Sequence, residues 1–318
     1  MKLKLFAFII CLFAGLATFA QTRSKEAGFQ SDNDSFLAQG SDRYYTNGFF
    51  VFYRTALEVN GSSKLANKVL GFELGQKIFN AQSGQLPSAA YVDRPVAGYL
   101  YLASSLNLLY KNESNLKLTG RVGIVGPAAG GETIQKFIHN TFNFYELNTW
   151  QYQVRNDVEL NLSANYNKLL ARATWADVSI ATYANLGTGF TGAGAGPLFR
   201  LGNFNQLFQS VSTQSTASKN TGNQLLHNHE LFFYYKPQVN VIVYDATVQG
   251  SIFKDHPVPN TQEITADIKP FVFSNQLGVS YASGRFVLDA SAIFNTKNVK
   301  GMARTHQWGS FTVLYRFN

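Results

Sequence analysis

Residues 115–126 read N-L-K-L-T-G-R-V-G-I-V-G and alternate between two kinds of side chain. One parity is apolar apart from a glycine and the other is polar: Leu116, Leu118, Gly120, Val122 and Ile124 against Lys117, Thr119 and Arg121. A period of two predicts a β-strand with two unlike faces. A run of about ten such residues exceeds the usual soluble strand and suits a strand tilted across a bilayer.

The same alternation recurs along the chain, at residues 49–57, 158–166, 284–294 and 308–317. We predict twelve strands, centred near residues 29, 51, 73, 101, 120, 158, 176, 196, 236, 270, 290 and 312. An even number of strands puts both termini on the periplasmic side of a membrane barrel. The predicted fold is therefore an all-β, antiparallel transmembrane β-barrel of about 12 strands, with a short helix in an extracellular loop.

Strand parity assigns each connection to one side of the membrane. The outward connections are 34–44, 80–94, 126–150, 187–189, 245–262 and 295–305. The periplasmic connections are 58–66, 110–115, 166–169, 203–228 and 281–284. The segment 203–228 is rich in Gln, Ser, Thr and Asn, which predicts a flexible loop, although it is long for a periplasmic turn. No internal repeat or second domain is evident, so 21–318 is expected to be one barrel.

The first twenty residues predict a secretory signal peptide. Lys2 and Lys4 form a basic start, an apolar run follows, and a small residue, Ala20, marks the cleavage site. We favour this interpretation over lipid modification at Cys11, which lies inside the apolar run. Cys11 is the single cysteine. The mature chain therefore has no disulfide framework, thiol nucleophile or thiolate metal site.

Charge and hydropathy limit which kinds of exported protein the sequence can be. Loss of Lys2 and Lys4 lowers the formal charge from +8 to +6, which suits an anionic partner such as lipopolysaccharide, while export makes nucleic acid an unsuitable one. After residue 20 there is no apolar run long enough for a transmembrane helix. Aromatic residues make up 14% of the chain and the mean hydropathy is −0.10. A soluble β-protein and a membrane barrel both fit these values, and the long alternating strands favour the barrel.

The last strand ends in Phe317, followed by Asn318. A terminal aromatic residue resembles the assembly signal of outer-membrane barrels. An ordinary final strand explains it equally well.

Two outward connections carry chemistry. In residues 33–48, Asp34 and Asp42 are hard oxygen donors and Thr46 and Asn47 add neutral oxygens, a set that suits Ca²⁺. A polar hairpin loop with an Asx turn explains the same residues and is the more common meaning of such a pattern.

In residues 126–150, a Gly-Gly pair precedes a predicted short helix on which Gln135 and His139 share a face. Histidine is the commonest general base near neutral pH, and Glu146 could supply a carboxylate. A histidine that merely stabilises a helix end is the alternative.

Other candidates are weaker. There is no G-x-S-x-G nucleophile motif, and the glycines of 192–196 lie within a strand rather than in a phosphate loop. His227 and His229 fall on a periplasmic segment, and His256 could only be a supporting residue. Arg94 could bind a lipid A phosphate or pair with Asp93 or Asp42.

Together these segments resemble the lipid A 3′-O-deacylase (LpxR) family of outer-membrane barrels. The resemblance is carried by residues 33–34 with 42–48, by 93–98, by 126–131, and by Gln135 with His139 and Trp150. It covers the N-terminal half of the mature chain well. The C-terminal half matches only as strands of about the right number.

The resemblance implies a Ca²⁺-dependent esterase site between the barrel wall and an outer-loop helix. It implies that His139 activates water, that Asp34 is a calcium-site carboxylate, and that Asn33, Thr46 and Gln135 belong to the active site. Glu146 is the best match to a further metal-site carboxylate. Arg94, Asp42 and Arg43 are substrate-binding candidates. Some members carry a lysine after the third strand, whereas residues 81–85 here contain none.

The expected mechanism is hydrolysis without a covalent intermediate. Ca²⁺ would polarise the ester carbonyl of lipid A, His139 would deprotonate water, and acyl chains would lie against the outer wall. We expect a monomer in the bacterial outer membrane, with the active-site loops facing outward. The alternative is a non-catalytic barrel: a channel, a receptor or a structural protein.

Overall fold

The computed structural model describes residues 23–38, 42–220, 222 and 224–318. The signal peptide predicted for residues 1–20 lies outside this part. Twelve antiparallel strands form a closed barrel in which each strand pairs with its neighbours in sequence and β1 pairs with β12. The prediction of a twelve-stranded antiparallel barrel is therefore confirmed.

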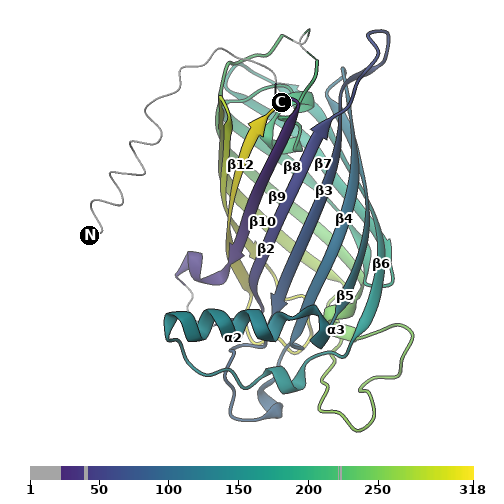
Figure 1. The fold of residues 1–318 in the computed structure, drawn as a ribbon, viewed down its shortest axis with the longest axis vertical. Coiled ribbons are helices and arrows are strands. Elements are labelled where there is room, and N and C mark those ends of the chain that lie inside the picture. The colour runs from purple at the N-terminus through teal and green to yellow at the C-terminus, as the bar shows by residue number, and fades with distance from the viewer. Residues whose placement is uncertain (1–22, 39–41, 221, 223) are drawn as a thin grey trace, which may run out of the picture.

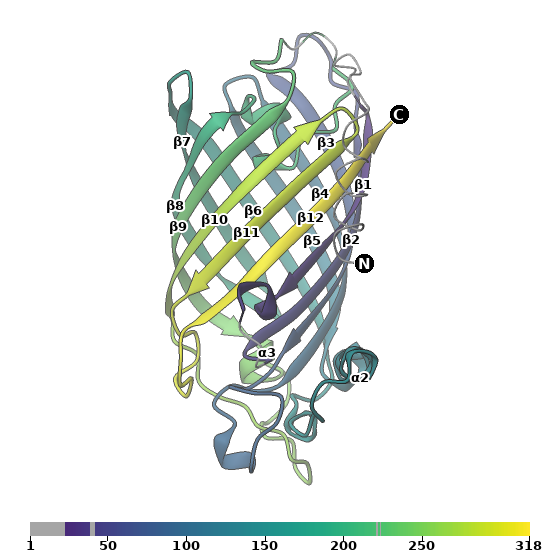
Figure 2. The same ribbon diagram turned by 90° about the vertical axis from the view of Figure 1, so that its left-hand side faces the viewer.

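The strands are long and their order follows the sequence (Figures 1 and 2). They are β1 (Lys25–Asn33), β2 (Tyr45–Ala56), β3 (Leu65–Phe79), β4 (Ala97–Tyr110), β5 (Ser114–Val125), β6 (Asp157–Arg172), β7 (Ala176–Gly187), β8 (Phe190–Asn203), β9 (Glu230–Asp245), β10 (Phe271–Ser283), β11 (Phe286–Asn295) and β12 (His306–Phe317). The helical segments are η1 (Asp34–Leu37), η2 (Ala89–Tyr91), η3 (Pro127–Ala129), α2 (Gly131–Phe142), η4 (Trp150–Tyr152), η5 (Leu207–Gln209), η6 (Val211–Thr213) and α3 (Ala246–Gln249).

Alternation along the strands separates an apolar outer wall from a polar lumen. Large apolar side chains are exposed on the outside, among them Phe29, Val51, Leu102, Val122 and Leu162. The side chains of the opposite parity are buried inside and include Glu26, Arg54, Asn107, Glu159 and Arg200. An outward apolar face with an inward polar face is the pattern of a barrel that spans a membrane. No helix of the described residues is both long and apolar enough to cross a bilayer.

Several predicted strand positions were wrong. The sixth and seventh strands, predicted to be centred near residues 158 and 176, instead begin at Asp157 and Ala176. The turn predicted at 166–169 lies inside β6, which runs to Arg172, because Asn167 points into the lumen and donates from Nδ2 to Asn115 Oδ1 (3.0 Å). The turn at 281–284 shifts to residues 284–285, since β10 extends to Ser283. The tenth strand begins after Pro270 rather than being centred there, as proline has no N–H to donate to a sheet.

The segment 203–228 was predicted to be a flexible loop, and this was wrong for its first part. Residues 204–218, here called the plug, fold into the lumen at the end of the barrel where β1 begins and β12 ends, here called the termini end (Figure 1). Asn67 of β3 donates from Nδ2 to the carbonyl oxygens of Phe208 and Ala217 (3.1 and 2.9 Å). Asn107 of β4 donates to the carbonyl of Thr213 (2.8 Å). These strand amides hold the plug in place.

Buried ion pairs surround the plug. Arg200 pairs with Asp177 (2.6 Å) and donates to Ser210 Oγ (2.9 Å), while Glu230 accepts from Ser210 Oγ and from the backbone N–H of Val211 (2.6 and 2.9 Å). Farther in, Val211 of the plug packs against a cluster of inward aromatic side chains, among them Phe52, Tyr99 and Tyr101. A lumen cavity of about 250 Å³ lies beside this contact, lined by Phe52 and Val211. The lumen is thus filled by side chains and closed by the plug at the termini end.

Candidate active site

At the opposite end of the barrel, α2 lies across the outside of the wall, against β3 and β4 (Figures 1 and 2). Glycines allow this close approach, since a Cβ added at Gly98 of β4 would lie 3.1 Å from the backbone nitrogen of Gly131. Outward-facing Ile78 packs with Val96, Leu147 and Trp150 beneath the helix. The predicted helix in the connection 126–150 is confirmed, and it encloses a layer between itself and the wall.

His139 lies in the last turn of α2 and is 4% exposed. The helix ends at Asn143, whose left-handed conformation (φ 56°) turns the chain back toward the histidine. His139 Nδ1 is then 2.7 Å from the carbonyl oxygen of Tyr145. A carbonyl oxygen only accepts, so Nδ1 donates and Nε2 is the nitrogen left for proton transfer. His139 Nε2 lies 3.0 Å from Asp42 Oδ2.

Asp42 is therefore the carboxylate beside the histidine. The same oxygen, Oδ2, also accepts from the hydroxyl of Tyr145. Burial and the adjacent Asp42 carboxylate hold the pKa of the Tyr145 phenol well above its usual range, so it stays a donor. From the sequence, Asp42 is a candidate oxygen donor for Ca²⁺ and a candidate substrate-binding residue. Its contact with His139 was not predicted, because residues 97 positions apart carry no spacing signal for a contact.

Asp34 is the second carboxylate of this end. It is 3% exposed, opens η1, and accepts from the backbone N–H of Arg43 (2.8 Å). Burial raises its pKa to about 7, and the nearby charge of Asp42 adds to the rise. Within the described residues, Asp34 forms no ion pair. Two carboxylates that repel one another, one of them buried, fit a hard cation in charge and in atom type.

No cluster of three or more His, Cys, Asp or Glu side chains within the described ranges could hold a metal ion. Any cation held by Asp34 and Asp42 would therefore take its other ligands from amide, hydroxyl or backbone oxygens, or from water.

Asn33 and Thr46 lie on the neighbouring strand ends. Asn33 donates from Nδ2 to Asn47 Oδ1 (2.7 Å), and its own oxygen caps η1 at Ser35. The pairing of β2 with β3 shifts at Thr46, and this buried hydroxyl accepts from Asn80 Nδ2 (3.1 Å). The irregular register brings these polar side chains to the rim of the wall.

Gln135, one turn before His139, is fully buried under α2. Its Oε1 accepts from Trp150 Nε1 (2.9 Å), whereas its Nε2 has no partner. The Trp150 indole thus fixes the orientation of the Gln135 amide and leaves the Nε2 donor of Gln135 unbonded.

Two predicted residues, Glu146 and Arg94, are not brought into this group, whereas Arg43 is. Glu146 is exposed, and the described contacts do not link it to His139. Arg94 is 2% exposed and donates to Pro95 O and Thr247 Oγ1 (2.7 and 2.9 Å), which keeps it away from any external phosphate. Arg43 lies beside Asp42 and donates from Nε to Gln82 O (3.4 Å).

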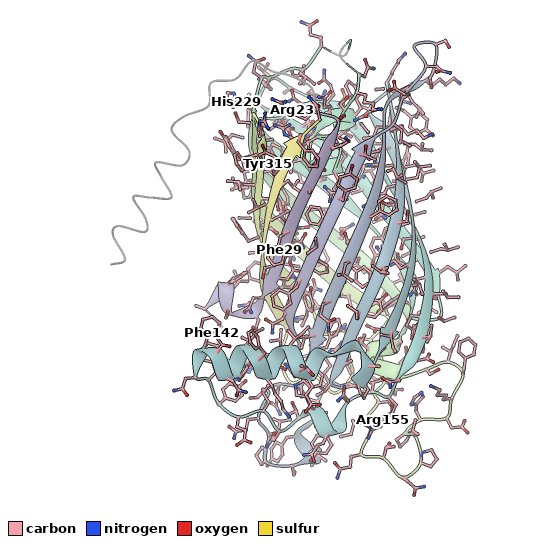
Figure 3. The ribbon with its side chains drawn as sticks, viewed as in Figure 1. Arg23, Phe29, Phe142, Arg155, His229 and Tyr315 are labelled. Carbon is pink, nitrogen blue, oxygen red and sulfur yellow. The ribbon has the colours of Figure 1, made fainter. Side chains whose placement is uncertain are left out.

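Two other histidines considered from the sequence, His229 and His256, lie outside this group. Figure 3 places His229 at the termini end, whereas Phe142 of α2 and Arg155 mark the opposite end, so His229 is far from His139. His256 Nδ1 is paired with Glu263 (2.8 Å) inside the loop that follows α3.

Comparisons with known proteins agree with the barrel fold. A family model described as "Outer membrane protein LpxR" matches residues 5–317. The solved structure of LpxR from Salmonella typhimurium superposes with a TM-score of 0.73 at 18% identity, covering 92% of this chain and 100% of that one. The β domain of the Bordetella autotransporter BrkA gives a TM-score of 0.47 at 11% identity, covering 93% and 99%. A search of curated proteins gave no match. The first likeness supports the fold, and the second is too weak to carry an argument.

Proposed function

This chain belongs to the LpxR family of outer-membrane proteins, and from this we propose that it hydrolyses the ester-linked 3′-acyl (acyloxyacyl) chain of lipid A. In this proposal Ca²⁺ assists the reaction and His139 is the general base. The α2 end faces outward from the cell, where lipopolysaccharide forms the outer leaflet.

The observation that carries the proposal is the orientation of His139. Its Nδ1 is held by the Tyr145 carbonyl, and its Nε2 points to the Asp42 carboxylate beside an apolar wall. When Asp42 turns toward the cation and water takes its place beside Nε2, an imidazole held at Nδ1 can accept a proton from that water and return it to the leaving sugar oxygen. Asp42 stabilises the imidazolium formed between these two transfers. A lipid can reach this group sideways from the membrane, because α2 lies outside the barrel.

Asp34 and Asp42 are the residues that would hold the cation. Asn33 adjoins Asp34 in the sequence, and Thr46 follows Asp42 by four residues, so these two could contribute neutral oxygens. When bound, Ca²⁺ supplies positive charge that stabilises the oxyanion of the ester. The Tyr145 hydroxyl keeps Asp42 in position. Arg43 is better placed than buried Arg94 to meet a sugar phosphate, since it adjoins Asp42.

Mass spectrometry of lipid A tests the proposal. Refolded protein in detergent is incubated with lipid A, in Ca²⁺ or in chelator. A calcium-dependent loss of mass equal to one acyl chain is the expected result. Full-length lipid A after incubation with several lipid A types would contradict it and would favour a non-catalytic barrel.

The channel form of that alternative has a separate test. The plug and the aromatic cluster fill the lumen, so we expect no steady conductance in planar bilayers. A stable open channel would favour transport over hydrolysis.

A further inference from the structure

Gln76 of β3 is a polar side chain in an apolar row. It shares its parity with Phe72 and Leu74, which are 49% and 47% exposed on the outer wall. Its neighbours in the sheet are Phe49 of β2 and Leu100 of β4. Gln76 therefore points outward, at the level where the lipid-facing wall passes under α2.

The carboxamide of Gln76 is buried and has no hydrogen-bond partner. The residue is 6% exposed, and both Nε2 and Oε1 are buried and unbonded. It is the only carboxamide of the described residues with both polar atoms in this state. A buried amide without partners is costly, so such a group in a folded protein calls for an explanation.

A second unused donor lies in the same layer. The next outward residue of β3, Ile78, packs against Trp150, and Trp150 binds Gln135 Oε1. The Nε2 of Gln135 has no partner either. Asn67 and Asn107, by comparison, use their amides to hold the plug, and other incompletely bonded amides, such as Asn161 and Gln209, leave a single buried atom unbonded. The unsatisfied amides of Gln76 and Gln135 thus belong to the space between α2 and the wall.

On the side away from α2, the next outward residue of β3 after Gln76 is Leu74, which borders an apolar hollow of about 1000 Å³ in the outer wall. Leu74, Leu102, Val122 and Leu160 border it, and Gly120 leaves room at its floor. The hollow faces lipid, so hydrocarbon is its natural occupant. Gln76 lies between this hollow and the polar groups around His139, where an acyl chain meets its ester.

We propose that Gln76 is a substrate-binding residue whose carboxamide bonds the ester carbonyl of a lipid A acyl chain, with the hydrocarbon lying in the hollow. This proposal rests on the proposed function, and it assigns Gln76 to the ester group of the lipid A acyl chain. The Nε2 donor meets the carbonyl oxygen, and Gln135 Nε2 offers a second donor in the same layer. Substrate then satisfies the groups that the protein leaves unbonded.

The variant Gln76→Met tests the proposal, since methionine has nearly the same shape but cannot hydrogen-bond in this way. We expect KM for lipid A to rise about tenfold with a smaller change in kcat, because one hydrogen bond to substrate is lost. The midpoint of thermal unfolding should stay the same or increase, since the variant removes an unsatisfied buried group.

Gln276→Met is the matched control. Gln276 faces the lumen and is bonded to Tyr234 and Ser291 (3.2 and 3.3 Å), so this variant should lower the unfolding midpoint and leave KM unchanged. If Gln76→Met lowers the midpoint as the control does, with KM unchanged, Gln76 is structural and the proposal is overturned.

A binding measurement separates this proposal from the proposed function. Native mass spectrometry compares lipid A binding to His139→Ala with binding to the double variant that also carries Gln76→Met. Weaker binding by the double variant supports the role of Gln76, even if the wild-type protein releases no acyl chain. Equal binding by the two proteins overturns it, whatever the activity of the wild type.

Discussion

The two ends of the barrel bury charged and polar groups in opposite ways. At the termini end, Arg200 and Asp177 are both fully buried and pair at 2.6 Å, and Glu230 accepts from several donors of the plug. At the α2 end, Asp34 is buried with no ion pair in the described structure, and Gln76 and Gln135 keep unbonded amide atoms.

This difference separates structure from function. A buried network whose members all have partners rigidifies a fold, whereas a partly satisfied network is unfavourable until something completes it. At the termini end, the buried charges of Arg200, Asp177 and Glu230 all have partners within the protein alone. In the proposed function, a cation and a lipid would complete the hydrogen bonding and charge pairing of the α2 end.

Replacing His139 should have the largest effect on turnover. His139→Ala removes the group that accepts the proton from water, so kcat should fall by about 10²–10⁴-fold. Release of fatty acid from lipid A measures the loss. Circular dichroism and the heat-modifiable migration of the barrel on gels should match the wild type. Undiminished release would exclude His139 as the base.

Replacing Asp177 should have the largest effect on stability. Asp177→Ala leaves Arg200 buried without its partner, which should cost about 3–5 kcal/mol of unfolding free energy. Urea titration of the protein in lipid vesicles measures this loss, and kcat of the folded fraction should be unchanged. Lys219→Ala, at an exposed ion pair with Glu58, is the control and should hardly change stability. If Asp177→Ala lowered kcat without lowering stability, the termini end would contribute to catalysis, and the contrast between the two ends would be wrong.

Asp34 should make calcium binding depend on pH. Its folded pKa of about 7 lies above the ordinary 3.8, so the folded protein keeps a proton there that the unfolded chain releases. Without a cation, the stability contributed by protonated Asp34 is present below the lower value and is lost as pH rises through about 7. A cation favours the ionised form, so calcium should raise the unfolding midpoint more at pH 8 than at pH 5.

The matching variant is Asp34→Asn, which should abolish both the calcium response and its pH dependence. Thermal scans with calcium and with chelator provide the measurement. An equal calcium response at the two pH values would place the cation away from Asp34.

The smallest effect is expected at Glu146. It is exposed and outside the contacts of His139, so Glu146→Gln should change kcat/KM by no more than about twofold. Asp42→Asn, which alters the carboxylate on His139 Nε2, should lower it by at least about tenfold. If Glu146→Gln lowered kcat/KM more than Asp42→Asn did, the family-based expectation for Glu146 would be right. The loop that follows α2 would then close differently around substrate.

The fold was predictable because lipid and lumen impose opposite demands on alternate residues, and this pattern is local. Strand boundaries failed where polar residues resembled a turn, as at Asn167, whose partner Asn115 lies on another strand. The plug was missed for the same reason, since its small polar residues become ordered only through Asn67, Arg200 and Glu230.

The motifs of the site could be predicted from the sequence, but the contacts between residues of different motifs could not. The helix with His139 and Gln135 follows from spacing, but the contact with Asp42 depends on the fold of two distant loops. Glu146 is turned to solvent because the chain after Asn143 presents the Tyr145 carbonyl to His139. One signal was overlooked: Gln76 interrupts the apolar parity of Phe72, Leu74 and Ile78.

The most direct test of the central claim is hydrolysis of lipid A in water enriched in ¹⁸O. Water activated at His139 must attack the acyl carbon, so the released fatty acid should carry one heavy oxygen, and release should disappear with His139→Ala. Fatty acid released without heavy oxygen, or released equally by the variant, would contradict the account.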